Sequence, residues 1–557
     1  MAESLTRRRL LGAAGATGAW LAWAAAGNSA HAVWAKPRFT VNPFTLGVAS
    51  GEPAPDGVVL WTRLAPDPLA ADGSGGMPAQ VVQVQWQVAT DPAFANVVAA
   101  GTTPATPELG HSVHTEVTGL APDREFFYRF HVGADTSAVG RTRTTPVAPG
   151  GSRLKFALAC CQNYAAGHYT AYEHLAQQDI DLVVFVGDYI YEGPGVGTVG
   201  RPHQPPREIF TLADYRIRYA QYKTDPALQA AHARAPWLVV FDDHEVDNNW
   251  AGGRPSDDQT VEDFLRRRAL AFQAYYESMP LRPFSAPVGD DIQVYRRATW
   301  GGLATFHVLD TRQFRDPYAC GGADFSTCPE AFDPARTMLG FPQEAWLADG
   351  FGQSQTRWDF VAQQGAFVRR WVDQNGVLML KMDAWDGYVG SQQRVTQAWV
   401  DAGVRNPVVL SGDIHAHWAS DLKLDYDTAG APLVGSELIA TSISSGGTGR
   451  DHVPGVHPTF ADNPHLRFYT NLRGYITVTV TPDQLQADYQ CVRDVTVPGA
   501  EVFRRASFVI DDGVRGLRQI YDGPPAAASA RELTEAERRA AIDELIAWES
   551  GDEQEGV

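Results

Sequence analysis

Two hydrophobic patterns divide the chain. From Phe39 to about Ala148, apolar and polar positions alternate with a period of two, and Pro, Gly and Asp residues separate the alternating runs. From Leu154 onward, short runs of consecutive apolar residues alternate with segments of helical spacing. The first pattern predicts an all-β domain. The second predicts a domain of the α/β class, in which both faces of the strands are buried.

The alternating region is typical of an immunoglobulin-like or fibronectin III-like β-sandwich. Its runs "VVLWTRL", "VQVQWQVAT" and "EFFYRFHVG" combine aromatic with β-branched residues, as strands do. We place this domain at residues 38–148 and find no catalytic cluster in it. The Pro- and Gly-rich stretch "TPVAPGGSR" is the predicted linker to a catalytic domain at residues 151–520.

The apolar runs of the second region end in polar residues that can do chemistry. Asp or His follows the strand at once in "LVVFVGDYIYEG", "WLVVFDDHEVDNNW", "LATFHVLDTRQF", "GVLMLKMDAWDGY" and "NPVVLSGDIHAHW". Strand ends are where α/β proteins build their sites. Packing alone does not account for so many ligand-type residues at strand ends, so we predict one site assembled from several of them.

The two ends of the chain lie outside this pattern. Consecutive arginines in "SLTRRRLLGAAG", followed by a weakly apolar run and "AHA", resemble a twin-arginine signal peptide at residues 1–35. This predicts export by the twin-arginine machinery to the periplasm or the extracellular space. The alternative is an N-terminal membrane anchor, although the run is weakly apolar for a span. No other segment reads as transmembrane. Residues 521–557 predict a helix with a "TEAE" capping box and an acidic tail.

Charge and cysteine content narrow the function. The 557 residues carry a formal net charge of −19, which disfavours stable binding of nucleic acid. An anionic substrate would need local cations, and metal ions can supply them. Five cysteines are too few for a disulfide scaffold. Cys320 and Cys328 bracket a short loop, and either one disulfide or two reduced thiols fits the sequence.

The stretch "GDYIY" places Asp188 at a strand end and Tyr191 three residues later. A carboxylate has two oxygens and can bridge two cations roughly 3.5–4 Å apart, as in two-metal hydrolases. A phenol has a free pKa of about 10, so it ionises near neutral pH only beside a strong Lewis acid such as Fe³⁺. Alone, this motif is equally compatible with a turn and a packed tyrosine.

The other strand ends make the metal interpretation stronger. They add a thiol of Cys160 or Cys161, Asn163, Asp243, His244, Asp413, His415 and His417. A thiolate, a phenolate and an imidazole suit a transition metal, whereas carboxylates suit Ca²⁺ or Mg²⁺. The set favours Fe³⁺ beside a hard divalent ion over a site built for zinc alone.

Five ordered motifs carry a resemblance to a known family: "CQNYAAGHYTAY", "GDYIYE", "FDDHEVDNNWAG", "WDGY" and "SGDIHAHW". They resemble the alkaline phosphatase D (PhoD-type) family of the metallophosphoesterases, which includes metal-dependent secreted phospholipases D. The resemblance extends over nearly the whole mature chain. It implies a metallophosphoesterase sandwich of two mixed β-sheets flanked by helices, preceded by the all-β domain. It also implies Fe³⁺, one or two Ca²⁺ ions, and hydrolysis of phosphate esters.

Carried over residue by residue, the resemblance assigns ligands. It places Fe³⁺ on Cys161, Asp188, Tyr191 and His415, and Ca²⁺ on Asp188, Asp243 and Asp413. Cys161 is chosen over its neighbour because it directly precedes "QNY". Asn163, Arg312, Asp386 and His417 are further candidates for contact with a metal or with the substrate.

The expected reaction is direct attack on phosphorus by a metal-activated hydroxide or oxo group. Asp188 would hold both metals, and His244 would protonate the leaving group; the alternative for His244 is a hydrogen bond to Asp243 or to the phosphate. Arg312 fits a phosphate contact or a structural ion pair equally well. The expected substrate is a phosphate monoester or diester. A phospholipase D acting on phosphatidylcholine-type lipids is the alternative, and a non-catalytic surface-binding protein is a weaker one.

Overall fold

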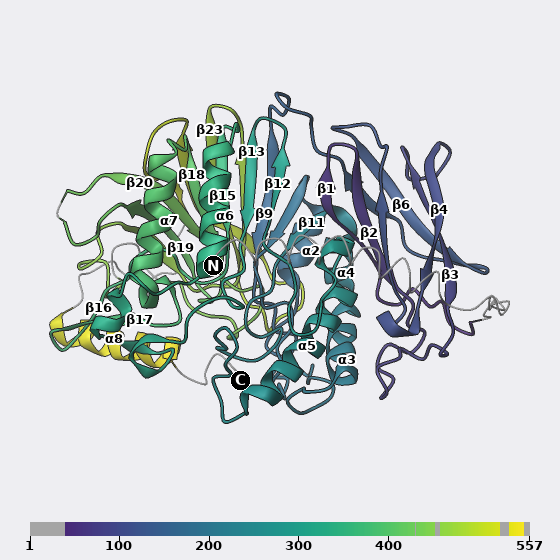
Figure 1. Ribbon diagram of the computed structural model, residues 1–557, viewed down its shortest axis with the longest axis horizontal. Coiled ribbons are helices and arrows are strands. Elements are labelled where there is room, and N and C mark those ends of the chain that lie inside the picture. The colour runs from purple at the N-terminus through teal and green to yellow at the C-terminus, as the bar shows by residue number, and fades with distance from the viewer. Residues whose placement is uncertain (1–38, 429, 452–456, 524–533, 551–557) are drawn as a thin grey trace, which may run out of the picture.

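The computed structural model describes residues 39–428, 430–451, 457–523 and 534–550. Two large mixed β-sheets lie at its centre, with helices on their outer faces (Figure 1). No helix within these ranges is both long and apolar enough to cross a membrane. The predicted signal peptide and the acidic tail beyond residue 550 lie outside the described residues.

The larger sheet has ten strands. Their order is β25 (Arg518–Asp522), β24 (Val502–Asp511), β23 (Gln484–Val492), β22 (Gly474–Val480), β9 (Leu154–Ala159), β10 (Leu182–Phe185), β11 (Trp237–Val239), β1 (Val48–Ala54), β2 (Gly57–Arg63) and β5 (Ser112–Val117). The central strands β9, β10 and β11 are parallel. All residues of β10 and β11 are buried, which explains their unbroken apolar runs.

The second sheet has seven strands and faces the first. Its order is β12 (Arg296–Trp300), β13 (Ala304–Val308), β15 (Trp358–Ala362), β18 (Pro407–Ser411), β20 (Leu433–Ile439), β19 (His417–Lys423) and β21 (Leu466–Thr470). The ring of Phe156 in the first sheet meets Phe306 and Phe360 of the second edge-on, at 5.4 and 5.3 Å between ring centroids. One apolar core therefore joins both sheets.

Helices cover the outer faces. Helices α6 (Gly340–Gln353) and α7 (Val389–Asp401) pack on the seven-stranded sheet, while α2 (Thr170–Gln177), α3 (Leu212–Lys223), α4 (Pro226–Arg234) and α5 (Val261–Ser278) share the core of the ten-stranded sheet. The contact between Phe272 of α5 and Phe241, at 5.0 Å between centroids, is one of these packing contacts. The prediction of two mixed sheets flanked by helices is confirmed.

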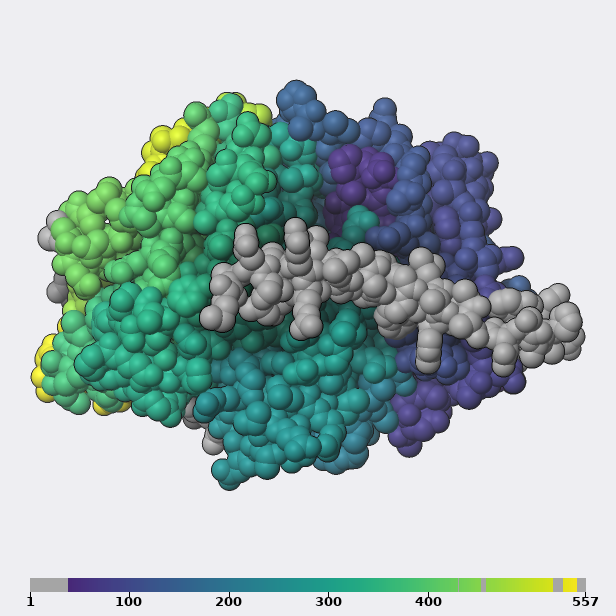
Figure 2. Space-filling view, viewed as in Figure 1, coloured from purple at the N-terminus to yellow at the C-terminus, as the bar shows by residue number. Residues whose placement is uncertain are grey.

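The N-terminal region is all-β, as predicted, and forms the purple lobe in Figure 2. A sheet of β4 (Val97–Ala105), β3 (Val82–Ala89), β6 (Glu125–Val132), β7 (Asp135–Thr136) and β8 (Gly140–Arg143) packs against β1, β2 and β5. These last three strands also extend the ten-stranded sheet, because Gly51 of β1 pairs in parallel with Trp237 of β11. A Cβ at Gly51 would lie 2.5 Å from the Pro280 carbonyl oxygen, so this pairing requires glycine. The boundaries at residues 38–148 stay a prediction.

One predicted strand lies elsewhere than expected. The run "GVLMLKMDAWDGY" contains β17 (Val377–Lys381), which belongs to a small antiparallel sheet with β14 (Phe325–Ser326) and β16 (Val372–Gln374). Its first two side chains are half exposed, and the apolar run gave no sign of this. Helix α8 (Glu535–Ser550) packs on this sheet, and Thr534 and Glu537 form the predicted capping box at its start.

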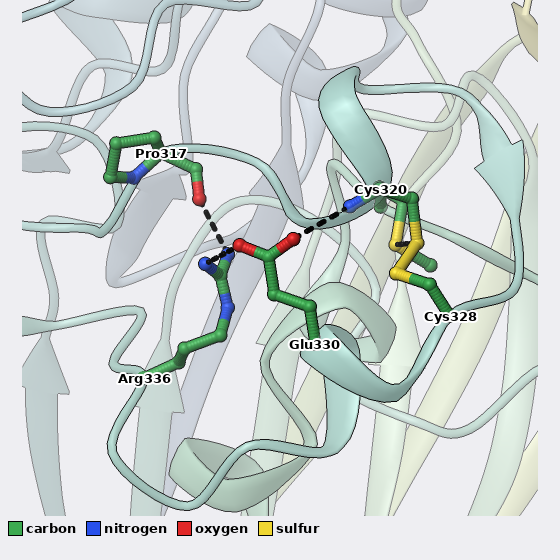
Figure 3. Close-up of a disulfide and its surroundings, with 6 residues drawn as sticks. Pro317, Cys320, Cys328, Glu330 and Arg336 are labelled. Carbon is green, nitrogen blue, oxygen red and sulfur yellow. Dashed lines mark hydrogen bonds and ion pairs between the residues drawn. A yellow bond between two sulfur atoms is a disulfide. The ribbon is translucent and has the colours of Figure 1, made fainter.

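A disulfide closes the loop between Cys320 and Cys328 beside the small sheet (Figure 3). The Glu330 carboxylate accepts a hydrogen bond from the backbone N–H of Cys320 at 3.2 Å and pairs with Arg336 at 3.0 Å. Of the two alternatives that the sequence left open, the structure contains the disulfide. Among the described residues, Cys160, Cys161 and Cys491 are free and buried.

Candidate metal centre

The carboxyl ends of β9, β10, β11 and β18 meet between the two sheets. A parallel backbone bridge between Cys160 and Ser442 joins the sheets there. Four of the predicted ligands follow these strands with positive φ values, which residues other than glycine seldom adopt: Cys161 (56°), Asp188 (58°), Asp413 (68°) and His415 (48°). Strained backbone of this kind clusters at functional sites, so the strain supports the predicted site.

Gly187 and Glu245 shape the turn that carries Asp188. Gly187 has φ of 115°, and a Cβ there would lie 2.5 Å from the Cβ of Asp242. The Glu245 carboxylate accepts hydrogen bonds from the backbone N–H groups of Asp188 (3.1 Å), Tyr189 (2.6 Å) and Asp242 (3.0 Å). Burial raises the pKa of Glu245 to about 8, while these backbone N–H donors favour its charged form. Sequence reasoning missed Glu245, although it stands in "FDDHE".

One group of predicted ligands combines sulfur, nitrogen and oxygen atoms. Ligand atoms of Cys161, Asp188 and His415 all lie within 4.8 Å of one another. The Tyr191 hydroxyl joins them, 3.1 Å from Asp188 Oδ2 and 3.0 Å from His415 Nε2. The thiol of Cys160 instead points away, toward the carbonyl oxygens of residues 440 and 441 at 3.6 and 3.5 Å. The structure therefore places Cys161, rather than Cys160, beside Asp188 and His415, and its role as an iron ligand stays a prediction.

A second group consists of carboxylates. Oxygen atoms of Asp242, Asp243 and Asp413 lie within 4.8 Å of one another, and so do ligand atoms of Asp188, Asp243 and His244. Asp188 and Asp243 each belong to two groups, so the candidate positions for two ions adjoin. Sequence reasoning singled out Asp243, where the resemblance implies a calcium ligand, and missed the adjacent Asp242.

The guanidinium of Arg312 lies within this carboxylate group. It bonds Asp242 at 2.5 Å and Asp383 at 2.9 Å, and it lies 3.5 Å from Asp243 and 3.6 Å from Asp413. The structural ion pair that the sequence left as an alternative is therefore present. Contact of Arg312 with phosphate stays a prediction.

Several buried polar atoms of the site have no hydrogen-bond partner among the described residues. They are Asp188 Oδ1, Asp242 Oδ2, Asp243 Oδ1 and His415 Nδ1. Burial raises the pKa of Asp188 and Asp413 well above its usual value, and carboxylates nearby add to the effect. Burial also lowers the pKa of His415, which keeps its imidazole neutral. Carboxylate oxygens that accept no hydrogen bond and a neutral imidazole suit a bound cation, so the residues fit a metal centre.

His244 has a different environment from His415. Its Nδ1–H donates to the Glu192 carboxylate at 2.7 Å, and Glu192 also accepts from the Asn248 backbone N–H at 2.6 Å. Burial opposes protonation, but Glu192, Asp243 and Asp188 together hold the pKa of His244 well above its usual value. The ring lies 4.2 Å from that of Tyr191. Sequence reasoning missed Glu192, which directly follows "GDYIY".

Three further candidates make hydrogen bonds to backbone groups. Asn163 Oδ1 accepts from the Ala165 backbone N–H at 2.9 Å. Asp386 accepts from the Arg370 backbone N–H at 3.0 Å and pairs with Arg369 at 3.1 Å. His417 begins β19, where its Nδ1 accepts from the Thr441 backbone N–H at 3.1 Å. Among the groups of His, Cys, Asp and Glu that the described residues form, none includes Asp386 or His417, and the predicted contacts of all three side chains stay predictions.

Comparison with known proteins shows which class of enzyme this protein belongs to. The PhoD-like phosphatase family matches residues 156–489, and its N-terminal domain matches residues 28–146. The structure is similar to a purple acid phosphatase from yellow lupin seeds, with a TM-score of 0.52, 12% identity, and coverage of 83% of this chain and 74% of that one. At that identity the likeness concerns the fold alone. The protein is thus a phosphoric ester hydrolase with the metallophosphoesterase fold.

More similar proteins give the family. Alkaline phosphatase D of Bacillus subtilis (strain 168) is 48% identical over 498 residues, which cover 88% of this chain and 85% of that protein. A solved structure of PhoD has a TM-score of 0.85 and 45% identity, and it covers 92% of this chain and 99% of that one. The chain belongs to the PhoD-like phosphatase family and is of the alkaline phosphatase D type.

Proposed function

We propose that the protein is an exported phosphatase or phosphodiesterase that works with Fe³⁺ and Ca²⁺. The observation that carries the proposal is the adjoining pair of buried ligand groups, one with thiol, phenol and imidazole side chains and one of carboxylates, with Asp188 between them. The first donor set suits Fe³⁺ and the second suits Ca²⁺. Cys161, Asp188, Tyr191 and His415 would hold iron, and Asp188, Asp243 and Asp413 would hold calcium.

When bound, the two ions would supply positive charge to the phosphate and lower the pKa of the attacking water. The protein's own residues order the ligands, balance their charge and supply a proton. Glu245 orders the turns that present Asp188 and Asp242. The guanidinium of Arg312 lies among four aspartates, and its positive charge offsets part of their negative charge. Glu192 orients His244 through Nδ1, which leaves the other ring nitrogen free to give a proton to the leaving alkoxide.

A hydrolysis panel tests this function. The mature protein, loaded with both metals, should release phosphate from monoesters or alcohol from diesters, and its activity should fall when a chelator removes the divalent ion.

Export is tested separately. Replacing Arg7 and Arg8 by Lys should retain the protein in the cytoplasm if the N-terminal segment is a twin-arginine signal. Fractionation of the expressing cells with an activity assay gives the answer.

The mixed donor group predicts colour. Ferric iron on the Tyr191 phenolate and the Cys161 thiolate should give a charge-transfer band in the visible spectrum. Tyr191→Phe should weaken and shift that band, while Tyr169→Phe, which changes a buried tyrosine that bonds the Gln162 carbonyl, should leave it unchanged. Absorption spectra together with elemental analysis check the expectation. Active, natively expressed protein with zinc and no iron would contradict it, as would a colourless iron-loaded form.

The cluster of aspartate carboxylates predicts a bound divalent ion that can be removed while iron stays in place. A Ca²⁺-selective chelator should lower activity by about 10- to 100-fold, because the phosphate loses one of two cations while the Arg312 guanidinium remains nearby. Iron should stay bound, and added Ca²⁺ should restore the rate. Activity and metal content measured on the same sample check both points. Full activity after complete calcium removal, with no other divalent ion present, would show that the carboxylates do not hold a catalytic ion.

A further inference from the structure

Arg312 is a buried cation whose orientation is fixed by one carboxylate. It follows strand β13, and its side chain is only 2% exposed. Its two terminal nitrogens donate to the two carboxylate oxygens of Asp383, at 2.9 and 3.3 Å. Two parallel bonds to one carboxylate set the plane and the direction of a guanidinium, which a single bond does not. Among the ligand groups that the described residues form, none includes Asp383. It therefore holds Arg312 from outside those groups.

Two further side chains hold Asp383 itself. It follows strand β17 of the small sheet, and both Arg315 and the Tyr318 hydroxyl donate to its Oδ1 at 2.7 Å. Burial opposes ionisation of Asp383, but the guanidinium groups of Arg312 and Arg315 lower the pKa of its carboxyl below the usual value. The residue that anchors Arg312 is therefore ionised and has its own anchors.

The same guanidinium faces two of the proposed calcium ligands. Its Nη2 lies 3.5 Å from Asp243 Oδ1 and 3.6 Å from Asp413 Oδ1, close enough for an ion pair but longer than an ordinary hydrogen bond. Asp243 Oδ1 is buried and has no hydrogen-bond partner among the described residues. Arg312 thus attracts these oxygens but leaves their lone pairs open to another cation.

A calcium ion on Asp243 and Asp413 would lie beside a positive charge that cannot withdraw. Like charges a few ångströms apart repel each other more strongly inside a protein than in water, because screening is weaker there. Arg312 also draws on the negative charge of the same two carboxylates that would hold the ion. Both effects act in one direction, since each lowers the affinity of the carboxylate group for a divalent cation.

We propose that Arg312 keeps the calcium affinity of this group low, so that the ion exchanges with the surroundings, and that Asp383 is the residue that positions Arg312. The activity of the enzyme then follows the calcium concentration around it: low where Ca²⁺ is scarce and high where Ca²⁺ is plentiful. This inference deepens the proposed function and rests on it, because it takes Asp188, Asp243 and Asp413 as ligands of a catalytic Ca²⁺ ion.

Calcium binding by the iron-loaded mature protein, stripped of divalent ions with a chelator and measured by calorimetry, tests the charge of Arg312. The wild type should bind Ca²⁺ with a Kd weaker than about 10⁻⁵ M, as sites that respond to extracellular calcium do. Arg312→Gln should bind it about tenfold more tightly or better, because a neighbouring positive charge is gone. Arg312→Lys, which keeps a charge, should bind Ca²⁺ more weakly than Arg312→Gln.

Asp383→Asn should change the affinity in the opposite direction. This substitution keeps the size of the side chain but removes the negative charge that shares the guanidinium, so more of the charge of Arg312 acts on Asp243 and Asp413. Ca²⁺ should then bind about tenfold more weakly. If both residues served only to support the structure, both substitutions would weaken binding. Opposite signs in the two variants are therefore the signature of the electrostatic role.

The ion pair of Arg467 and Asp421 provides matched controls. The two side chains lie 2.8 Å apart, and Asp421 belongs to none of the ligand groups among the described residues. Arg467→Gln and Asp421→Asn make the same chemical changes there and should leave the calcium affinity and the iron content unchanged. The rise in Tm that Ca²⁺ causes, measured for every variant, should give the same order of affinities without any turnover.

Activity measured against free calcium in a chelator buffer connects affinity with function. The half-maximal calcium concentration should fall in Arg312→Gln and rise in Asp383→Asn, whatever the maximal rate of each variant. Wild-type protein that binds no Ca²⁺ and keeps full activity without it would overturn the proposed function at its calcium site.

The remaining outcomes bear on the inference alone. Weaker or unchanged calcium binding in folded Arg312→Gln would overturn it while the proposed function stands, and so would a wild-type Kd tighter than about 10⁻⁵ M. Circular dichroism shows whether each variant is folded. If Arg312→Gln does not fold, Asp383→Asn decides, because unchanged or tighter binding in that variant overturns the inference.

Discussion

His415→Ala should lose iron and most of its activity together. The His415 imidazole lies beside Asp188, Cys161 and the Tyr191 hydroxyl, and burial keeps it neutral, as a metal ligand must be. A metal ion contributes several kcal/mol of transition-state stabilisation, so we expect a fall in kcat of about 10³-fold or more. The visible absorption band should disappear with the iron.

The control is the neighbouring histidine. His417→Asn keeps an acceptor for the Thr441 backbone N–H, and His417 belongs to none of the ligand groups among the described residues. This variant should retain iron, colour and most activity. Metal analysis of both purified variants, with circular dichroism to confirm folding, checks the pair. Iron retained at the wild-type level in folded His415→Ala would exclude His415 as a ligand.

His244→Ala should keep iron and lose rate in a way that depends on the leaving group. Glu192 occupies Nδ1 of His244 and raises its pKa, so the ring is protonated and oriented to act as an acid. General acid catalysis contributes about 10²–10⁴-fold, and we expect a loss of this size with an alkyl ester. With a nitrophenyl ester the loss should shrink, since that oxygen leaves without a proton.

The structure also makes a competing role for His244 testable. One of its ring nitrogens lies within 4.8 Å of oxygens of Asp188 and Asp243, as a metal ligand would. Metal content separates the two roles, because an acid can be removed without loss of an ion. His174→Ala is the control, since this histidine is half buried and bonds Tyr475 away from the site. A variant of His244 that loses a metal, or is equally impaired with both leaving groups, would assign the acid to another residue.

Much of the centre could be predicted because strand ends converge in parallel sheets. Asp188, Asp243 and Asp413 each lie just beyond an apolar run, and the structure places Asp243 in one ligand group with Asp188 and in another with Asp413. The residues that sequence reasoning missed act through partners distant in the chain. Glu192 bonds a histidine 52 residues away, and Glu245 bonds backbone groups 56 and 57 residues away. No local pattern reveals such partners.

By itself the sequence determined the class of each region, the strand ends that carry candidate ligands, and the donor types that favour a mixed metal pair. These are local properties, because the period of the hydrophobic pattern, the length of an apolar run and the types of ligand residue depend only on neighbouring residues in the sequence. Only the tertiary structure decided that the N-terminal strands extend the catalytic sheet through Gly51 and Trp237, that Arg312 lies among the aspartates, and that Asp383 holds its guanidinium there. Those features depend on which surfaces meet, and packing between distant segments settles that.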